Sequence, residues 1–196
     1  ALGSHRRKLN VPGEKEYAGK GVAYCATCDG ALFQGANVGV VGGGNSAAQS
    51  AILLSQYAKK VYILYRRGSL RADPIFIDRI EKKEKIEVKC CVNVKEIKGD
   101  EKEMKSVLLD TGEEMELEGL FIEIGWIPNT DLAKKLGIEL DEKGLIKIND
   151  LTETNIKGVF AAGDCTTRPF KQAVVAAADG STAAYSAFNY VKSLEE

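Results

Sequence analysis

The chain has 196 residues and sets 27 lysines and arginines against 28 aspartates and glutamates, for a formal net charge of -1. This balance argues against a nucleic-acid binder and against a polybasic membrane anchor, because both need an excess of cations. Hydrophobic residues make up 44% of the sequence, which is enough to form a core. No apolar run approaches the roughly 18 residues of a membrane span. The polar segment 1–8 lacks the pattern of a secretory signal, so we expect a cytoplasmic protein.

Predicted strands and helices alternate along the chain, which is typical of an α/β fold. Strands are expected at 22–24, 37–41, 61–65, 86–94, 106–110, 114–117, 120–124, 145–148 and 158–161. Helices are expected at 46–58, 75–85, 130–136 and 171–194. Residues 37–65 read strand–helix–strand, which predicts parallel strands and a right-handed crossover. The pair Thr111-Gly112 predicts a hairpin turn between two later strands.

The cysteines indicate redox chemistry. The chain has five cysteines and one histidine, which suits neither a secreted disulfide scaffold nor a tetrahedral zinc site, so no metal is expected. Cys25 and Cys28 form a C-x-x-C pair that can close a small disulfide ring. We expect a helix beginning near Cys28 to lower the pKa of that thiol, and Asp29 to act as a proton donor. The alternative, two inert buried thiols, stays open on spacing alone.

A glycine-rich motif follows the predicted strand 37–41 and opens the next helix. It has the form G-x-G-x-x-A and consists of Gly42, Gly43, Gly44, Asn45, Ser46 and Ala47. Glycines permit a tight turn and let backbone N–H groups approach a pyrophosphate, which the helix N-terminus also favours. The flanking strands and helix are the context that such a motif requires. The sequence therefore predicts a dinucleotide site here, against the alternative of a tight turn that binds nothing.

Two further segments predict contacts to cofactors. Arg66, Arg67 and Arg71 follow the second strand of the unit, where an NAD site would carry an acidic residue. Cations at this corner suit the 2′-phosphate of NADPH, although a solvated basic loop would look the same. The segment 158–164 reads as a buried strand that ends in Gly163 and Asp164, whose carboxylate could accept from a sugar hydroxyl. A plain strand–turn fits that segment equally well.

Taken together, these motifs resemble the low-molecular-weight thioredoxin reductases of the flavin disulfide reductase group. The matching segments stand in the family's order and at its spacing over nearly the whole chain. They are CATCDG (25–30), GGGNSA (42–47), YRRGSLRA (65–72), IGWIPNT (124–130) and GVFAAGDCT (158–166).

The resemblance implies a Rossmann-like NADPH-binding domain, with a parallel sheet and a small antiparallel sheet, inserted in a partial FAD-binding Rossmann-like domain. Residues 14–123 would form the NADPH domain and carry the dithiol. Residues 1–13 would end the first FAD-domain segment, and 124–196 would form the C-terminal one. Hydride would pass from NADPH to FAD and electrons on to the Cys25–Cys28 disulfide. The resulting dithiol would reduce a protein disulfide, usually that of thioredoxin.

The resemblance also implies roles for residues of the C-terminal segment. Asp164 would bind the FAD ribitol, and Gly125 and Gly163 would line the cofactor. The residues expected near the flavin ring are Lys171, Gln172 and Ala173. Rotation of the two domains about hinges near residues 12–13 and 125–126 would bring dithiol and nicotinamide to the flavin in turn. A homodimer is also expected from the resemblance.

Some features depart from the family pattern. The family's first strand–glycine–helix motif, which binds the FAD pyrophosphate, has no counterpart here, so we expect a partial chain with weak or no FAD binding and no complete turnover. Lys171 stands where arginine is common, and residues 48–50 (AQS) stand where an acidic pair is common. Two alternatives stay open. One is the flavoprotein subunit of alkyl hydroperoxide reductase, which the segments 163–167 and 186–188 resemble. The other is a flavin-free NADPH-binding or redox-sensing module.

Overall fold

The computed structural model describes residues 1–195 and divides the chain into two compact units. One unit is the continuous stretch Arg7–Gly125, and the other combines Ala1–Arg6 with the chain from Trp126 onward. The sequence-based domain limits lie after residues 13 and 123, whereas the units change over after Arg6 and after Gly125. Which cofactor each unit binds stays a prediction.

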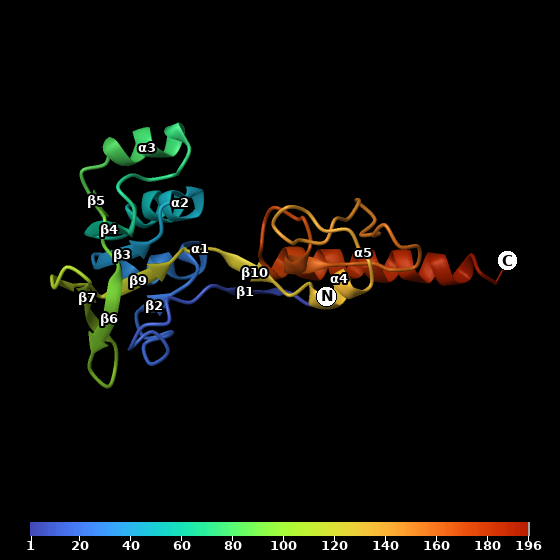
Figure 1. Cartoon of the computed structure of the whole chain (residues 1–196), viewed down its shortest axis with the longest axis horizontal. Helices are drawn as coiled ribbons and strands as arrows, with labels where there is room; N and C mark the ends of the chain where they lie inside the picture. The colour runs from blue at the N-terminus through green and yellow to red at the C-terminus, as the bar shows by residue number, and fades with distance from the viewer. Residues whose placement is uncertain (196) are drawn as a thin grey trace. The chain divides into compact units, whose positions relative to one another are not determined.

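A five-stranded parallel sheet organises the unit Arg7–Gly125. In spatial order its strands are β2 (Val22–Ala23), β9 (Gly119–Ile122), β3 (Asn37–Val41), β4 (Lys60–Tyr65) and β5 (Ile86–Cys90). Each neighbouring pair is parallel, so the carboxyl ends of the strands lie along one edge. The helix α2 (Asn45–Leu54) joins β3 to β4, and α3 (Pro74–Glu81) packs on α2 (Figure 1). The predicted α/β class and the β-α-β unit are confirmed.

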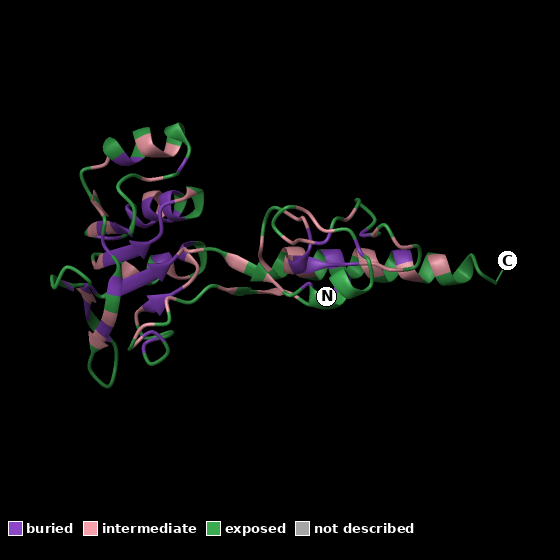
Figure 2. Cartoon of the chain, in the orientation of Figure 1, coloured by how far each residue is buried: buried purple, intermediate pink, exposed green. Residues whose placement is uncertain are grey.

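Both faces of this sheet are buried. Successive residues of a strand point to opposite faces, and on each face they pack in a hydrophobic core. Val38, Val40 and Phe121 belong to the core that contains residues of α2 and α3. Val41 and Leu120 belong to a second core on the other face. Figure 2 shows buried residues concentrated in these central strands. Burial on both faces is the reason that these strands read as continuous apolar runs in the sequence.

A three-stranded antiparallel sheet covers the second face. Its strands β6 (Val94–Gly99), β7 (Met104–Leu109) and β8 (Glu114–Glu116) pair in sequence order. The turn between β7 and β8 contains Gly112 with a φ of +88°, a conformation that favours glycine. The hairpin predicted at this turn is confirmed, whereas β6 was not expected from the sequence.

The other unit has less regular structure. β1 (Ser4–Arg6) and β10 (Trp126–Pro128) pair as an antiparallel ribbon, which was not expected from the sequence. The short helix α4 (Asp131–Lys135) follows, and the long helix α5 (Ala173–Lys192) ends the unit. A small core holds the loops between these helices together. Its buried members are Ala133, Ile138, Ile146, Ala161 and Cys165.

Two predicted strands in this unit are wrong. The segments 145–148 and 158–161 make only isolated bridges, of Ile146 with Leu140 and Thr166, and of Phe160 with Glu153. A strand needs a ladder of hydrogen bonds to a neighbour, and the described residues supply one bridged pair at each of these points.

Other predicted elements have the right type and the wrong ends. The strand predicted over 86–94 ends at Cys90, because Cys91 adopts a φ of +61° and turns the chain. The helices predicted over 46–58 and 75–85 end at Leu54 and Glu81. Element ends depend on local hydrogen bonds that an apolar periodicity does not encode.

Candidate functional site

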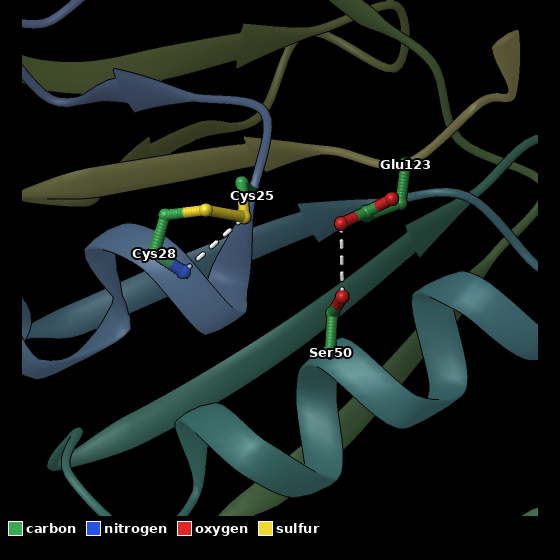
Figure 3. The surroundings of a disulfide bond; sticks show 4 residues. All are labelled: Cys25, Cys28, Ser50 and Glu123. Carbon is green, nitrogen blue, oxygen red and sulfur yellow. Dashed lines mark hydrogen bonds between the residues drawn. A yellow bond between two sulfur atoms is a disulfide. The ribbon is translucent and has the colours of Figure 1, made fainter. Parts of the chain in front are cut away.

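The cysteine pair lies at the carboxyl edge of the parallel sheet. Cys25 follows β2 and is the N-cap of the short helix α1 (Ala26–Asp29). Cys25 and Cys28 form a disulfide with Cα atoms 5.3 Å apart (Figure 3). Cys28 is exposed, and Asp29, at the end of α1, is half-buried. The pair predicted from the C-x-x-C spacing is therefore bonded and open to solvent on one side.

The helix at this pair begins earlier than expected. Its N-terminus lies at Ala26, so Cys25 and not Cys28 occupies the N-cap. The backbone N–H of Cys28 donates to Cys25 Sγ at 3.2 Å. Cys28 lies in the first turn of α1, so the expected effect of the helix N-terminus on the Cys28 thiol stays a prediction.

A buried carboxylate supports the strand that leads into the pair. Glu14 is 5% exposed and accepts from the backbone N–H groups of Leu9 and Asn10, at 3.1 and 2.7 Å. The Tyr24 hydroxyl also donates to it, at 2.9 Å. Burial, and then the neighbouring Glu14 carboxylate, raise the pKa of Tyr24. Lys8 Nζ lies 3.6 Å from the centre of the Tyr24 ring. These contacts tie the segment 8–14 to the residue that precedes Cys25.

The glycine turn follows β3 at the same edge of the sheet. Gly42 has a φ of +144°, and a Cβ atom there would lie 2.4 Å from the backbone oxygen of Glu123. A Cβ atom on Gly43 would lie 2.4 Å from the Tyr65 ring, whereas one on Gly44 would meet nothing within 4 Å. Gly42 and Gly43 are thus required by the packing of the turn. Gly44 leaves open space at the start of α2, where backbone N–H groups could receive an anion.

The side chains in the first turn of α2 differ in their contacts and burial. Asn45 forms two hydrogen bonds with Asp73, one to its carboxylate and one from its backbone N–H, both 2.8 Å long. Ser46 is exposed, and Ala47 is fully buried under the turn. The Asn45 side chain therefore braces the loop before α3, a contact that the sequence did not indicate.

The structure brings one of the three predicted arginines directly to the glycine turn. The backbone N–H of Arg71 donates to Gly43 O at 2.6 Å, and Arg71 Nε donates to the Tyr65 hydroxyl at 2.8 Å. Arg66 and Arg67 follow β4 and are exposed. All three residues therefore lie in the loop between β4 and α3, and Arg71 contacts the turn that opens α2.

The site residues predicted in the other unit surround a short 3-10 helix. This turn, η2 (Gly163–Cys165), starts with Gly163 at a φ of +76° and carries the half-buried Asp164. Lys171 Nζ donates to Thr166 O at 2.6 Å, and burial lowers the pKa of Lys171 while Asp164 opposes that shift. Gln172 is the N-cap of α5, and Ala173 is its exposed first residue.

An ion pair that the sequence did not predict holds this turn. Asp179 of α5 is 5% exposed and accepts from the backbone N–H of Gly163 at 3.2 Å and from Arg168 Nε at 2.9 Å. The one feature of the sequence that could have indicated this ion pair was an acidic residue in the middle of an alanine-rich helix. Gly125, also predicted as a site residue, is exposed at a φ of +106°, and its oxygen accepts from the Arg7 N–H.

Within the part of the chain that the structure describes, no group of three or more His, Cys, Asp or Glu side chains could hold a metal ion. Over the same residues, no helix combines the length and the apolar character needed to cross a bilayer.

The comparison with known families decides the class of protein. The pyridine nucleotide-disulphide oxidoreductase family matches residues 1–180. The chain belongs to this family. The Cys25–Cys28 bond is consistent with the disulphide in the family's name, and the glycine turn at the same sheet edge is consistent with the nucleotide.

Relatives of this pyridine nucleotide-disulphide oxidoreductase include two named kinds of protein. The thioredoxin reductase of Bacillus subtilis (strain 168) is 44% identical over 100% of this chain and 63% of the relative. A subunit of the alkyl hydroperoxide reductase of Escherichia coli (strain K12) is 39% identical over 97% of this chain and 37% of the relative. The crystal structure of thioredoxin reductase from Streptococcus pyogenes MGAS5005 matches with a TM-score of 0.91 and 40% identity, over 97% of this chain and 64% of that one. The chain spans just under two thirds of these thioredoxin reductases.

Proposed function

We propose that this chain is the NADPH-binding and disulfide-bearing part of a thioredoxin-disulfide reductase that uses FAD. The observation that carries the proposal is the position of the Cys25–Cys28 disulfide and the glycine turn at the same carboxyl edge of one parallel sheet. In open α/β sheets this edge is where ligands bind. The names of the relatives supply the substrate class of the proposal, because the thioredoxin reductases cover the whole chain at the higher identity.

The residues at the glycine turn fit NADPH. The space beside Gly44 at the start of α2 would receive the pyrophosphate, whose charge the helix N-terminus stabilises. Arg66, Arg67 and Arg71 would bind the 2′-phosphate, and the bond from Arg71 to the Tyr65 hydroxyl fixes that arginine beside the turn. NADH lacks this phosphate, so the arginines would select for NADPH.

The residues of the other unit fit one end of FAD. Asp164 offers an acceptor for a ribitol hydroxyl, and its carboxylate lies close enough to Lys171 to oppose the lowering of the Lys171 pKa by burial. Lys171, Gln172 and Ala173 would then border the flavin ring. In the sequence a strand–glycine–helix motif for the pyrophosphate occurs once, at residues 42–47, where it serves the nicotinamide nucleotide. We therefore expect weak or no binding of FAD by this chain.

When bound, NADPH and FAD would together supply two electrons to the Cys25–Cys28 disulfide. The S–S bond breaks, and two protons complete the dithiol, one of them from Asp29 beside the pair. The thiolate of one cysteine then attacks a disulfide of thioredoxin, which forms a mixed disulfide and releases one thioredoxin sulfur. The thiolate of the other cysteine attacks the mixed disulfide and displaces the second thioredoxin sulfur, and the two protons lost by the cysteine pair are balanced by the two that thioredoxin gains. The chain returns to its disulfide, and thioredoxin leaves as a dithiol.

A single-turnover transfer tests this proposal without either cofactor. The chain is reduced, freed of reductant under argon and mixed with oxidised thioredoxin. We expect thioredoxin to gain two thiols and the chain to lose two, counted by alkylation and mass spectrometry. Cys25→Ser and Cys28→Ser should abolish the transfer, and Cys90→Ser should leave it intact. If the reduced chain leaves thioredoxin oxidised, the proposal fails.

The same experiment separates the alternatives. Transfer to the disulfide module that reduces a peroxiredoxin, without transfer to thioredoxin, would favour the flavoprotein subunit of alkyl hydroperoxide reductase. Transfer to neither, with NADPH still bound, would favour a redox-sensing module. The homodimer, which the resemblance implies, also forms part of our proposal, as does a cytoplasmic location.

A further inference from the structure

The loop between β4 and α3, residues 66–73, is bonded to the glycine turn near its end. We call it the arginine loop. The backbone N–H of Arg71 donates to Gly43 O at 2.6 Å. Two residues further along both segments, the backbone N–H of Asp73 donates to Asn45 Oδ1 at 2.8 Å. Asn45 Nδ2 donates in return to Asp73 Oδ2, also at 2.8 Å. The last residues of the arginine loop therefore lie alongside the residues that open α2.

The Asp73 carboxylate is used for this contact and not for its own helix. Asp73 is the N-cap of α3, where an aspartate side chain usually accepts from a backbone N–H of the first turn. Its side chain makes no such capping hydrogen bond, and the N–H of Phe76 donates to the Asp73 backbone oxygen at 2.9 Å. Loss of the carboxylate would thus remove a contact of the arginine loop without removing a side-chain cap from α3.

Asn45 receives this contact at the place proposed for the pyrophosphate. It is the first residue of α2 and directly follows Gly44, beside which the pyrophosphate would lie. Both polar atoms of its amide are bonded to Asp73, so its side chain is directed toward the arginine loop. The binding of the pyrophosphate is left to backbone N–H groups. One side chain therefore connects the proposed pyrophosphate site with the arginine loop.

The start of the arginine loop is held by different contacts. The backbone N–H of Cys91 donates to Arg67 O at 3.1 Å, and that of Val92 donates to Tyr65 O at 3.2 Å. Gly68 and Ser69, in the middle of the loop, are exposed. Loss of the contact between Asp73 and Asn45 would therefore loosen the loop at the glycine turn and leave its start in place.

We propose that Asp73 is a positioning residue for nucleotide selection, because its contact with Asn45 holds the arginine loop where the arginines reach the 2′-phosphate of a nucleotide bound at the glycine turn. This inference rests on the proposed NADPH site. The pyrophosphate and the 2′-phosphate belong to one molecule, so the turn and the loop must stand at a fixed spacing. A loop already held at that spacing loses less conformational freedom when the nucleotide binds.

The charge of Asp73 acts in the opposite direction to its contact. A carboxylate near a phosphate disfavours binding by like-charge repulsion, so its removal alone would strengthen NADPH binding. Loss of the contact with Asn45 would instead weaken it. NADH shares the pyrophosphate and lacks the 2′-phosphate, so both effects change the affinity for NADPH more than that for NADH. The two effects can therefore be separated by substitutions that remove the charge with and without the contact.

Titration calorimetry of the full chain with NADPH and with NADH tests the inference. The measured quantity is the selectivity, the Kd for NADH divided by the Kd for NADPH. Asp73→Ala removes the acceptor, and we expect the selectivity to fall roughly three- to tenfold, with the Kd for NADH within about twofold of the wild type. Asp73→Asn removes the charge and keeps an oxygen acceptor for Asn45. Its selectivity should equal or exceed that of the wild type.

Two further variants test the contact from its other side and from outside the loop. Asn45→Ala removes the partner and should lower the selectivity by about the same factor as Asp73→Ala. The double variant should show no further fall, because both substitutions remove one contact. Asp78→Ala removes an exposed carboxylate from α3, outside the arginine loop, and should leave the selectivity unchanged.

The outcomes distinguish the inference from the proposed function. An unchanged selectivity in Asp73→Ala overturns the inference, as does an equal fall in Asp73→Asn or in Asp78→Ala. An equal loss of affinity for NADPH and NADH in Asp73→Ala also overturns it, since a general disturbance of the turn would weaken both. A wild-type chain that binds NADPH no more tightly than NADH would instead contradict the proposed NADPH site.

Discussion

At the scale of single residues, we propose that the loop after β4 decides which nucleotide the chain accepts. Arg71 is fixed by Gly43 and Tyr65, whereas Arg66 and Arg67 are exposed and able to approach a phosphate. A charged hydrogen bond to a phosphate contributes about 1.5–3 kcal/mol. Arg66→Ala should therefore weaken NADPH binding roughly 10- to 100-fold and leave NADH binding unchanged.

Titration calorimetry with the two nucleotides measures this selectivity. Arg79→Ala is a suitable control, because Arg79 is an exposed arginine on α3, outside the loop. An equal loss of affinity for NADPH and NADH in Arg66→Ala would show that Arg66 does not recognise the 2′-phosphate.

Some residues of the candidate site could be predicted from the sequence and others could not. The glycines, the cysteines and the arginines could all be proposed as site residues from the sequence, because each motif has a fixed spacing along the chain. Asp179 was missed, since a lone acidic residue in an alanine-rich helix reads as an exposed position of that helix. Its importance comes from its contacts with Gly163 and Arg168, which the fold of the chain brings next to the helix.

At the scale of elements, the turn η2 depends on α5 through Asp179. The carboxylate binds Gly163 N–H and Arg168 Nε, so its removal leaves a half-buried guanidinium and a buried N–H without this partner. Asp179→Ala should lower the free energy of unfolding by about 2–3 kcal/mol. Urea unfolding measures this change.

The matched control uses the same arginine. Asp150 is fully exposed, and its carboxylate lies 3.7 Å from Arg168 Nη1. Exposed ion pairs contribute roughly 0–1 kcal/mol, so Asp150→Ala should have little effect. Similar destabilisation by both substitutions would contradict the special role of Asp179 at the turn.

The elements themselves were predictable where the sequence encodes both the strand and its partner. β3 and β4 are buried apolar runs joined by one helix, and they pair with each other as parallel strands. The segments 145–148 and 158–161 have a similar apolar pattern, yet they form isolated bridges. Apolar character thus predicts burial in both cases, and the available pairing decides whether a strand forms.

At the scale of the whole molecule, our proposal assigns both nucleotide binding and disulfide exchange to one unit. The disulfide and the glycine turn both lie in Arg7–Gly125, and Asp164 and Lys171 lie in the other unit. The central claim is that Cys25 and Cys28 are the thiols that exchange with thioredoxin.

Trapping the mixed disulfide tests that claim most directly. Cys25→Ser and Cys28→Ser each leave one thiol of the pair, which is offered a single-cysteine thioredoxin activated as its thionitrobenzoate disulfide. Attack by the remaining thiol releases thionitrobenzoate and leaves the two proteins joined. We predict that at least one variant gives a one-to-one adduct that maps to residue 25 or 28 and is released by reductant. No adduct in either variant, or an adduct at Cys90, Cys91 or Cys165, would contradict the account.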